Sequence, residues 1–385
     1  MMTKKANYQI CSRCVMDNAS DDTIRFDSDG CCNYCNDAIS KRPLLYFPNQ
    51  EGQEKLGKML RILKSAGKGR KYDCLMGLSG GLDSSYLAYL GAKKWGLRIL
   101  AIHIDDGYDT PLAQKNIENL CKACNIELIV ISPDSDQFND LTRSYFLAEV
   151  PNVAIPQDNV LFAALYESAR LNGIRYFLSG SNYALESILQ KGNTHDAFDM
   201  VNLKDIHSKF GTLQLDKLPL LSNRQKRLDL YVRNIQTFRP LNYIDYNKTN
   251  AINELSEFCG FEYYKAKHLE NTLTKVIQLY WFYEKFNVDK RRSHLSSLIV
   301  SNQITRDEAL VELSQPVYEI EELNKDIHFV LSKLNLSFDA FKELIHKEGK
   351  QHEQYKTEPP LSYISKLSWG IIHKLSQIIR FAMVF

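Results

Sequence analysis

Leu78-Ser-Gly-Gly-Leu-Asp-Ser-Ser85 is the stretch that decides the fold. It follows an apolar run from Tyr72 to Gly77 and leads into Tyr86-Leu-Ala-Tyr-Leu90, where apolar residues recur with helical spacing. Adjacent glycines let the backbone approach an anion, the serines supply hydroxyl donors, and the first N–H groups of a helix attract negative charge. The lysine of a Walker A loop is missing. We therefore expect a strand, an anion-binding turn and a helix.

Short strands and helices alternate around this turn. Strands are expected at 73–78, 98–104, 126–132 and 174–178, and helices at 53–65, 83–95, 111–122 and 159–171. This alternation predicts an α/β fold with a parallel sheet, whose ligands bind beyond the carboxyl ends of the strands. His103, Asp105, Asp106 and the turn Gly180–Asn182 would then lie at the same edge as the loop.

Four of the nine cysteines form two pairs, Cys11-Ser-Arg-Cys14 and Cys32-Asn-Tyr-Cys35, with 17 residues between the pairs. This spacing is typical of a tetrahedral zinc site, and a four-thiolate set leaves no open position, so the zinc would be structural. Cys31 is an alternative to Cys32 with a poorer spacing. We expect three parts: a zinc-binding module over 1–45, a nucleotide-binding α/β domain over 46–246, and a helical region over 247–385.

The composition is that of a globular protein, with 24% charged residues and a formal net charge of +2 over 385 residues. This balance favours no polyanionic partner, so we expect no nucleic acid to bind. The sequence contains no signal-like or membrane-spanning apolar segment, which predicts a cytoplasmic protein without a transmembrane segment. Residues 364–382 form an amphipathic helical pattern that could cover the protein's own core, a partner or a membrane surface.

The loop resembles the SGGxDS motif of the PP-loop ATP pyrophosphatases, adenine-nucleotide α-hydrolase-like enzymes that split ATP into AMP and pyrophosphate. Three further stretches resemble the N-acetyl sugar amidotransferase family of surface-polysaccharide and pseudaminic or legionaminic acid type biosynthesis. They are the cysteine-rich opening, Leu178–Ser187 and Lys285–Leu298, and Arg239–Lys248 also fits. The chain departs from the family at Lys267-His-Leu-Glu-Asn271, where a serine is replaced by Asn271.

The resemblance implies that an N-acetyl group on a nucleotide-linked sugar becomes an acetamidino group, in the biosynthesis of LPS, O-antigen or another surface glycan. ATP adenylates the carbonyl oxygen, ammonia replaces it, and Mg²⁺ neutralises the phosphates. Catalytic roles would fall to Asp83, Asn182 and Glu186. The residues expected to bind ATP are Leu78, Ser79, Gly80, Gly81, Asp83, Ser84, Ser85, His103, Asp105 and Gly180. Those expected to bind the substrate or its phosphates are Lys267, His268, Lys290, Arg291, Arg292 and His294.

The remaining cysteines do not suggest a glutaminase. Cys74 lies in an expected buried strand, whereas Cys121, Cys124 and Cys259 lie near helix ends. We therefore expect a separate glutaminase subunit to supply ammonia, with a cyclase-like ammonia-channel subunit, as the resemblance also implies.

Other interpretations stay open. A PP-loop tRNA thiolation enzyme would use Cys121-Lys-Ala-Cys124 with Cys259 for sulfur chemistry, and a scaffold subunit could keep the loop without turnover. Asp83 or Asp158 could cap helices, and Asp105 and Asp106 could be turn residues. Lys290–Arg292 could be a solvated helix face, and His103 a core histidine. The sequence identifies neither the sugar, its nucleotide and the reacting acetamido group, nor the oligomeric state.

Overall fold

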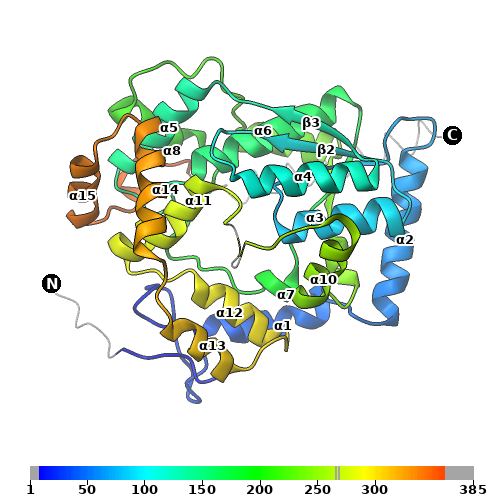
Figure 1. The fold of residues 1–385 in the computed structure, drawn as a ribbon, viewed down its shortest axis with the longest axis horizontal. Helices are drawn as coiled ribbons and strands as arrows, with labels where there is room; N and C mark the ends of the chain where they lie inside the picture. Colours follow the sequence, from blue (N-terminus) through cyan, green and yellow to red (C-terminus); the bar gives the residue numbers. More distant parts are fainter. Residues whose placement is uncertain (1–7, 265–266, 268, 360–385) are drawn as a thin grey trace.

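The computed structural model describes residues 8–264, 267 and 269–359 (Figure 1). Its centre is a sheet of five parallel strands in the order β3-β2-β1-β4-β5. The strands are β1 (Cys74–Gly77), β2 (Ile99–Ile104), β3 (Glu127–Ile131), β4 (Tyr176–Leu178) and β5 (Gln236–Phe238). The predicted parallel sheet is confirmed, and β5 adds a strand that the sequence did not suggest. Chain order reverses between β1 and β4, where parallel sheets open a crevice for ligands.

The two faces of the sheet have separate cores, because successive side chains of a strand point to opposite faces. Leu75 of β1 and Leu100 of β2 pack with α6 (Ile155–Leu171). Met76 and Ala101 belong instead to the core that contains α3 (Leu82–Tyr89) and α4 (Pro111–Cys124). Thr110 caps α4 by accepting a hydrogen bond from the amide of Ala113, and Pro111 is its first residue.

The chain after Asn247 is helical in the part that the structure describes, as predicted. Trp281 is fully buried in a third core, which also contains Phe138, Leu203, Val330 and Phe341. The predicted helix at 364–382 lies outside the described residues. The remaining α-helices are α1 (Asn33–Leu45), α2 (Gln50–Ala66), α5 (Ser135–Leu147), α7 (Tyr183–Glu186), α8 (Met200–Phe210), α9 (Asn223–Arg227), α10 (Lys248–Cys259), α11 (Thr272–Val276), α12 (Arg291–Val300), α13 (Arg306–Ser314), α14 (Ile320–Lys333) and α15 (Phe338–His346).

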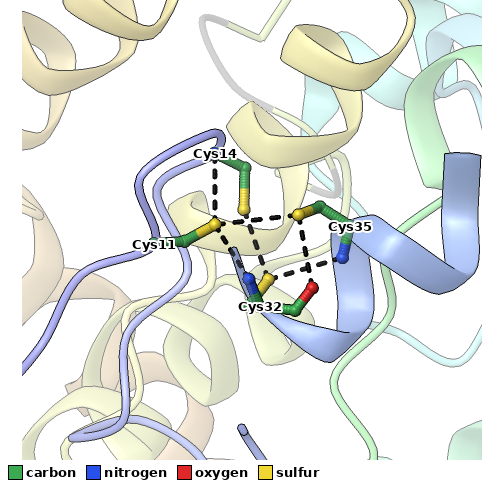
Figure 2. A group of neighbouring side chains, drawn as sticks. All are labelled: Cys11, Cys14, Cys32 and Cys35. Atoms are coloured by element: carbon green, nitrogen blue, oxygen red, sulfur yellow. Dashed lines mark hydrogen bonds between the residues drawn. The ribbon is translucent and has the colours of Figure 1, made fainter. Parts of the chain in front are cut away.

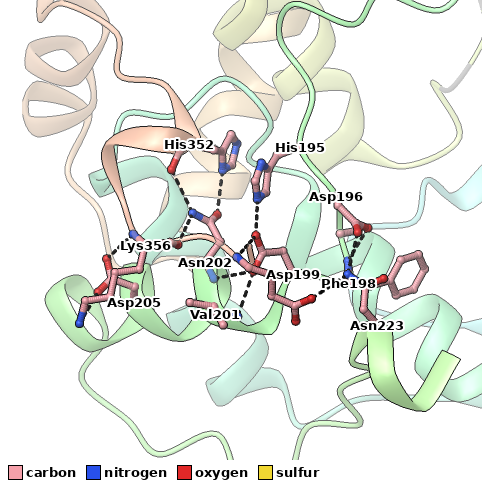
Figure 3. A network of polar contacts seen from close by, with 12 residues as sticks. His195, Asp196, Phe198, Asp199, Val201, Asn202, Asp205, Asn223, His352 and Lys356 are labelled. Atoms are coloured by element: carbon pink, nitrogen blue, oxygen red, sulfur yellow. Dashed lines mark hydrogen bonds and ion pairs between the residues drawn. The ribbon is translucent and has the colours of Figure 1, made fainter. Parts of the chain in front are cut away.

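Polar contacts tie residues 352–358 to α8 (Figure 3). The amide of Asn202 donates to the carbonyls of His352 and Lys356, each at 3.1 Å. The His352 ring stacks on His195, with centroids 4.6 Å apart, and His195 contacts Asp199 at 2.9 Å. Burial and the neighbouring His195 lower the pKa of His352 to about 3, so this anchor contains a neutral imidazole at pH 7.

None of the helices in the described ranges is long and apolar enough to cross a membrane.

Candidate functional site

The four paired cysteines converge (Figure 2). Their sulfur atoms lie within 4.8 Å of one another, and all four side chains are buried. The Cys11–Cys35 and Cys14–Cys32 sulfurs are 3.7 and 3.5 Å apart. A tetrahedral zinc with Zn–S bonds of about 2.3 Å places its sulfurs about 3.8 Å apart, so one such ion fits. Cys31 lies outside this group and contacts Ser12, which resolves the choice between Cys31 and Cys32.

Residues far along the chain hold this cysteine module in place. The guanidinium of Arg306 donates to the carbonyls of Cys11 and Cys14 at 3.0–3.2 Å. Arg292 of α12 forms an ion pair with buried Asp17 at 2.9 Å and donates to the carbonyl of Val15 at 2.8 Å. The module is therefore docked on α12 and α13, which lie beside α1 in Figure 1.

The loop after β1 has the geometry of an anion-binding turn. Gly80 has φ of +79°, and a Cβ there would lie 2.9 Å from the carbonyl of Ala113, so only glycine fits without strain. Gly81 is the N-cap of α3 and makes no side-chain capping bond. The first N–H groups of α3 are thus not satisfied by a capping side chain. Tyr264 fixes the turn from outside by donating to the carbonyl of Gly80 at 2.9 Å.

Two carboxylates and one ammonium meet beside this loop. Nζ of Lys267 lies 2.7 Å from Oδ2 of Asp83 and 2.7 Å from Oε1 of Glu186. Burial disfavours the ammonium, but the two carboxylates outweigh it and raise the pKa of Lys267. Tyr246 donates its hydroxyl to the other oxygen of Asp83. Asp83 therefore does not cap α3, because its carboxylate is directed toward Lys267 and Tyr246.

A cavity of about 260 Å³, the loop cavity, opens over these groups. Its walls come from the 79–84 loop, the turn before α7 and the end of that helix, α10, α12, α13, and the residues Tyr263, Tyr264, Lys267 and Glu270. Its lining residues include Ser79, Gly81, Asp83, Ser84, Gly180, Glu186, Lys248, Tyr263, Lys267, Glu270, Arg291 and His294.

A second cavity of about 510 Å³, the strand-end cavity, lies beyond the ends of β1 and β2. Leu78, His103, Asp106, Gln157, Asp158, Gln278 and Lys290 are among its lining residues. Its volume suits a small organic ligand. Ser79 and Glu270 line both cavities, so they lie at the boundary between the two.

Asp158 and Lys290, which line the strand-end cavity, have pKa values that burial shifts toward neutrality. Burial raises the pKa of Asp158 to about 6. Burial lowers the pKa of Lys290 to about 8, although Asp21 opposes this shift. The ammonium of Lys290 lies 4.4 Å from the centre of the Phe282 ring. Asp158 lies inside the first turn of α6, whose N-cap is Ala154, so the alternative that Asp158 caps this helix is wrong.

Several predicted site residues have structural contacts. Ser85 is fully buried and lines neither cavity. Asn182 caps α7 by accepting from the amide of Leu185 and donates to the carbonyl of Gly180. Asp105 accepts from the amide of Gly107, as a turn residue does. Asp106 accepts from the amide of Tyr108 but also lines the strand-end cavity.

His103 uses both ring nitrogens. Nδ1 lies 2.9 Å from the carbonyl of Leu78, and Nε2 lies 2.8 Å from Asp109. Burial would lower the pKa of His103, but Asp109 and the carbonyl raise it above its ordinary value. The ring therefore orients the end of β1 while also lining the strand-end cavity.

The Lys290–His294 stretch does not act as one patch. Lys290 lines the strand-end cavity, whereas His294 lines the loop cavity. Arg291 lines the loop cavity, but its guanidinium pairs with Asp289 at 2.8 Å and donates to the carbonyl of Gln315 at 3.0 Å. Arg292 faces the cysteine module, as described above. His268 lies outside the described residues.

Sequence reasoning missed four contributors: Tyr246, Lys248, Tyr263 and Glu270. Tyr246 and Lys248 belong to the family-like stretch Arg239–Lys248, which was the available signal. Glu270 belongs to the family-like stretch Lys267–Asn271, whose charged positions were the available signal, whereas Tyr263 lies on an irregular segment where no periodic pattern marks a residue. Only the folded chain brings them to the loop cavity.

A family model and a curated relative each match part of the chain. Residues 270–368 match a family model described as the C-terminal domain of WbpG-like LPS biosynthesis proteins, which confirms the family resemblance over that part. An uncharacterized protein of Methanocaldococcus jannaschii is 26% identical over 172 residues, or 44% of this chain. The chain spans 58% of the length of that relative.

Two solved structures are similar at low identity. The NMN synthetase from Francisella tularensis is 16% identical and covers 70% of this chain and 98% of its own, with a TM-score of 0.29. The U34-tRNA thiolase NcsA from Methanococcus maripaludis, solved with its 4Fe-4S cluster, is 14% identical and covers 82% and 90%, with a TM-score of 0.31. Both likenesses are too distant to bear on function.

Proposed function

We propose that this protein is an ATP-dependent amidotransferase that converts an N-acetyl group of a nucleotide-activated sugar into an acetamidino group, within LPS or related surface-glycan biosynthesis. One observation carries the proposal. The region that matches the LPS biosynthesis domain contributes Glu270, Arg291 and His294 to the wall of the loop cavity. The family-specific part of the chain and the ATP-pyrophosphatase motif thus meet at one place.

The reaction balances in two steps. The amide oxygen of the sugar attacks the α-phosphorus of ATP, the α–β bridging P–O bond breaks, and pyrophosphate leaves. Ammonia then adds to the carbon of the O-adenylyl imidate, the C–O bond breaks, and AMP leaves with that oxygen. The amide N–H proton leaves to pyrophosphate or solvent when the neutral imidate forms, and the acetamidine keeps all three hydrogens of ammonia as an amidinium. The loop hydroxyls and N–H groups would hold the pyrophosphate.

Divalent-cation binding fits the donor set. Asp83 and Glu186 offer hard carboxylate oxygens, which Mg²⁺ prefers, and both already contact a positive charge in Lys267. When bound, the ion supplies charge neutralisation of the phosphates. Lys290, without an ion-pair partner among the described residues, would meet an anionic group of the sugar nucleotide.

Ammonia would come from a separate glutaminase with a cyclase-like channel subunit. Burial raises the pKa of Cys121 and Cys124 to about 11, and it also raises the pKa of Cys74 and Cys259. These thiols are protonated at neutral pH and are poor nucleophiles. In the described ranges they form no metal-binding group, which disfavours the tRNA thiolation alternative.

Mass spectrometry of a reaction containing zinc-replete protein, Mg·ATP, ammonium and a panel of N-acetylated nucleotide sugars tests the proposal. We expect AMP, pyrophosphate and a sugar in which one oxygen has become NH. Asp83→Asn should abolish all three, whereas Asp37→Asn, at an exposed carboxylate of α1, should not. AMP formed only with tRNA and a sulfur donor would instead establish thiolation. ATP binding without AMP, even with a glutaminase present, would favour the scaffold interpretation.

A further inference from the structure

Lys267 and Glu270, three residues apart in the sequence, place opposite charges in the loop cavity of the ligand-free protein. The Lys267 ammonium lies 2.7 Å from one oxygen of Asp83 and 2.7 Å from one oxygen of Glu186. All three side chains are only 15–18% exposed. Water therefore screens this triad poorly, and the two carboxylates would repel each other strongly without the lysine.

The Glu270 carboxylate occupies the anion-binding loop itself. Its Oε1 accepts a hydrogen bond from Ser79 at 3.3 Å. A Cβ added at Gly81 would lie 2.6 Å from the same oxygen, so the carboxylate sits against the Gly81 backbone. This is the position where the glycine turn and the start of α3 are suited to hold a phosphate oxygen.

We propose that Lys267 and Glu270 are internal substitutes for the ligand, with the ammonium in the place of a divalent cation and the carboxylate in the place of a phosphate group. Both side chains leave these positions when Mg·ATP binds. The inference rests on the proposed function only in naming Mg·ATP as that ligand. The charges of the pair match those of a metal–phosphate complex, positive toward Asp83 and Glu186 and negative toward Ser79 and Gly81.

This arrangement favours joint binding of metal and phosphate. A phosphate that displaces Glu270 without a metal adds negative charge beside Asp83 and Glu186. A metal that displaces Lys267 without a phosphate must compete with an ammonium held by two carboxylates. Only the metal–phosphate complex replaces both charges at once. Since Glu270 lines both cavities, its departure would also open the boundary between them.

Equilibrium binding without sugar, ammonia or turnover tests the proposal. Mn²⁺ binding to the zinc-replete full chain is followed by electron paramagnetic resonance of the free ion, and inorganic pyrophosphate binding by calorimetry. We expect Lys267→Met to bind Mn²⁺ at least about tenfold more tightly than the wild type, because the competing charge is gone. Glu270→Gln should bind metal-free pyrophosphate more tightly. Lys115→Met, which removes an exposed lysine paired with Glu262, should change neither affinity.

The wild type alone provides a second measurement should Lys267→Met fail to fold. Mn²⁺ and pyrophosphate should each raise the affinity for the other by about tenfold or more. Unchanged or weaker Mn²⁺ binding by Lys267→Met, or independent binding of the two ligands by the wild type, would overturn the proposal. If the wild type binds neither Mn²⁺, pyrophosphate nor Mg·ATP, the proposed function fails as well. Binding without the Lys267 effect leaves the proposed function intact.

Discussion

Replacing Arg292 with alanine should destabilise the protein and leave acceptor binding by the folded enzyme unchanged. Arg292 pairs with Asp17 at 2.9 Å, and the Asp17 side chain is only 4% exposed. Removing one partner of a buried ion pair costs about 3–5 kcal/mol, because a charge is left uncompensated. Asp17 retains hydrogen bonds from the amide of Ser20 at 3.0 Å and the hydroxyl of Tyr8 at 3.2 Å. The Arg292 side chain is 16% exposed. We therefore expect the lower end, about 3 kcal/mol.

Urea unfolding of Arg292→Ala, Asp17→Asn and the double variant measures this loss and its coupling. The loss in the free energy of unfolding of the double variant should be smaller than the sum of the two single losses by about 1–3 kcal/mol. Arg61→Ala, at an exposed arginine of α2, is the control and should lie within about 0.5 kcal/mol of the wild type. A stable Arg292→Ala whose KM for the nucleotide sugar rises tenfold would refute the structural role and restore the substrate-binding interpretation.

Three further predictions concern other parts of the chain. The pKa of His352 is about 3 in the folded protein and 6.5 in the unfolded chain. Between these two pH values, the unfolded chain binds a proton on this imidazole that the folded protein does not. The contribution of His352 to the free energy of unfolding is fully present above pH 6.5, and about 2 kcal/mol of it is lost at pH 5. Urea titrations at the two pH values should find a smaller loss in His352→Asn. The purified protein should contain one zinc per chain, and removal of this zinc by a chelator, or the Cys14→Ser substitution, should unfold the cysteine module and expose residues 8–45 to proteolysis. Unchanged protease resistance without the metal would contradict a structural role for the ion. Lys290→Met should raise KM for the nucleotide sugar about tenfold with kcat and ATP binding little changed, whereas an equal loss in kcat would place Lys290 in the chemical step.

Local sequence was sufficient for the parallel sheet, the loop and the cysteine pairs. Each is encoded within a few residues: apolar runs that alternate with helical periodicity, Gly80 at positive φ before a helix, and two C-x2-C pairs that each bring two sulfurs close together. Such patterns extend over one turn or one strand, and they can therefore be recognised without knowing the rest of the fold.

Tertiary structure decided which charges reach the site. Lys290, Arg291 and Arg292 are adjacent in sequence, but a helix rotates each successive side chain by about 100°. Arg292 consequently meets Asp17 of the cysteine module, while Lys290 enters the strand-end cavity. Tyr246 and Glu270 reach the loop from irregular segments, whose path depends on long-range packing and not on periodicity. The sequence alone therefore determined the fold class and the glycine turn between β1 and α3, whereas only packing determined which distant side chains surround that turn, because charge partners are selected by proximity in space.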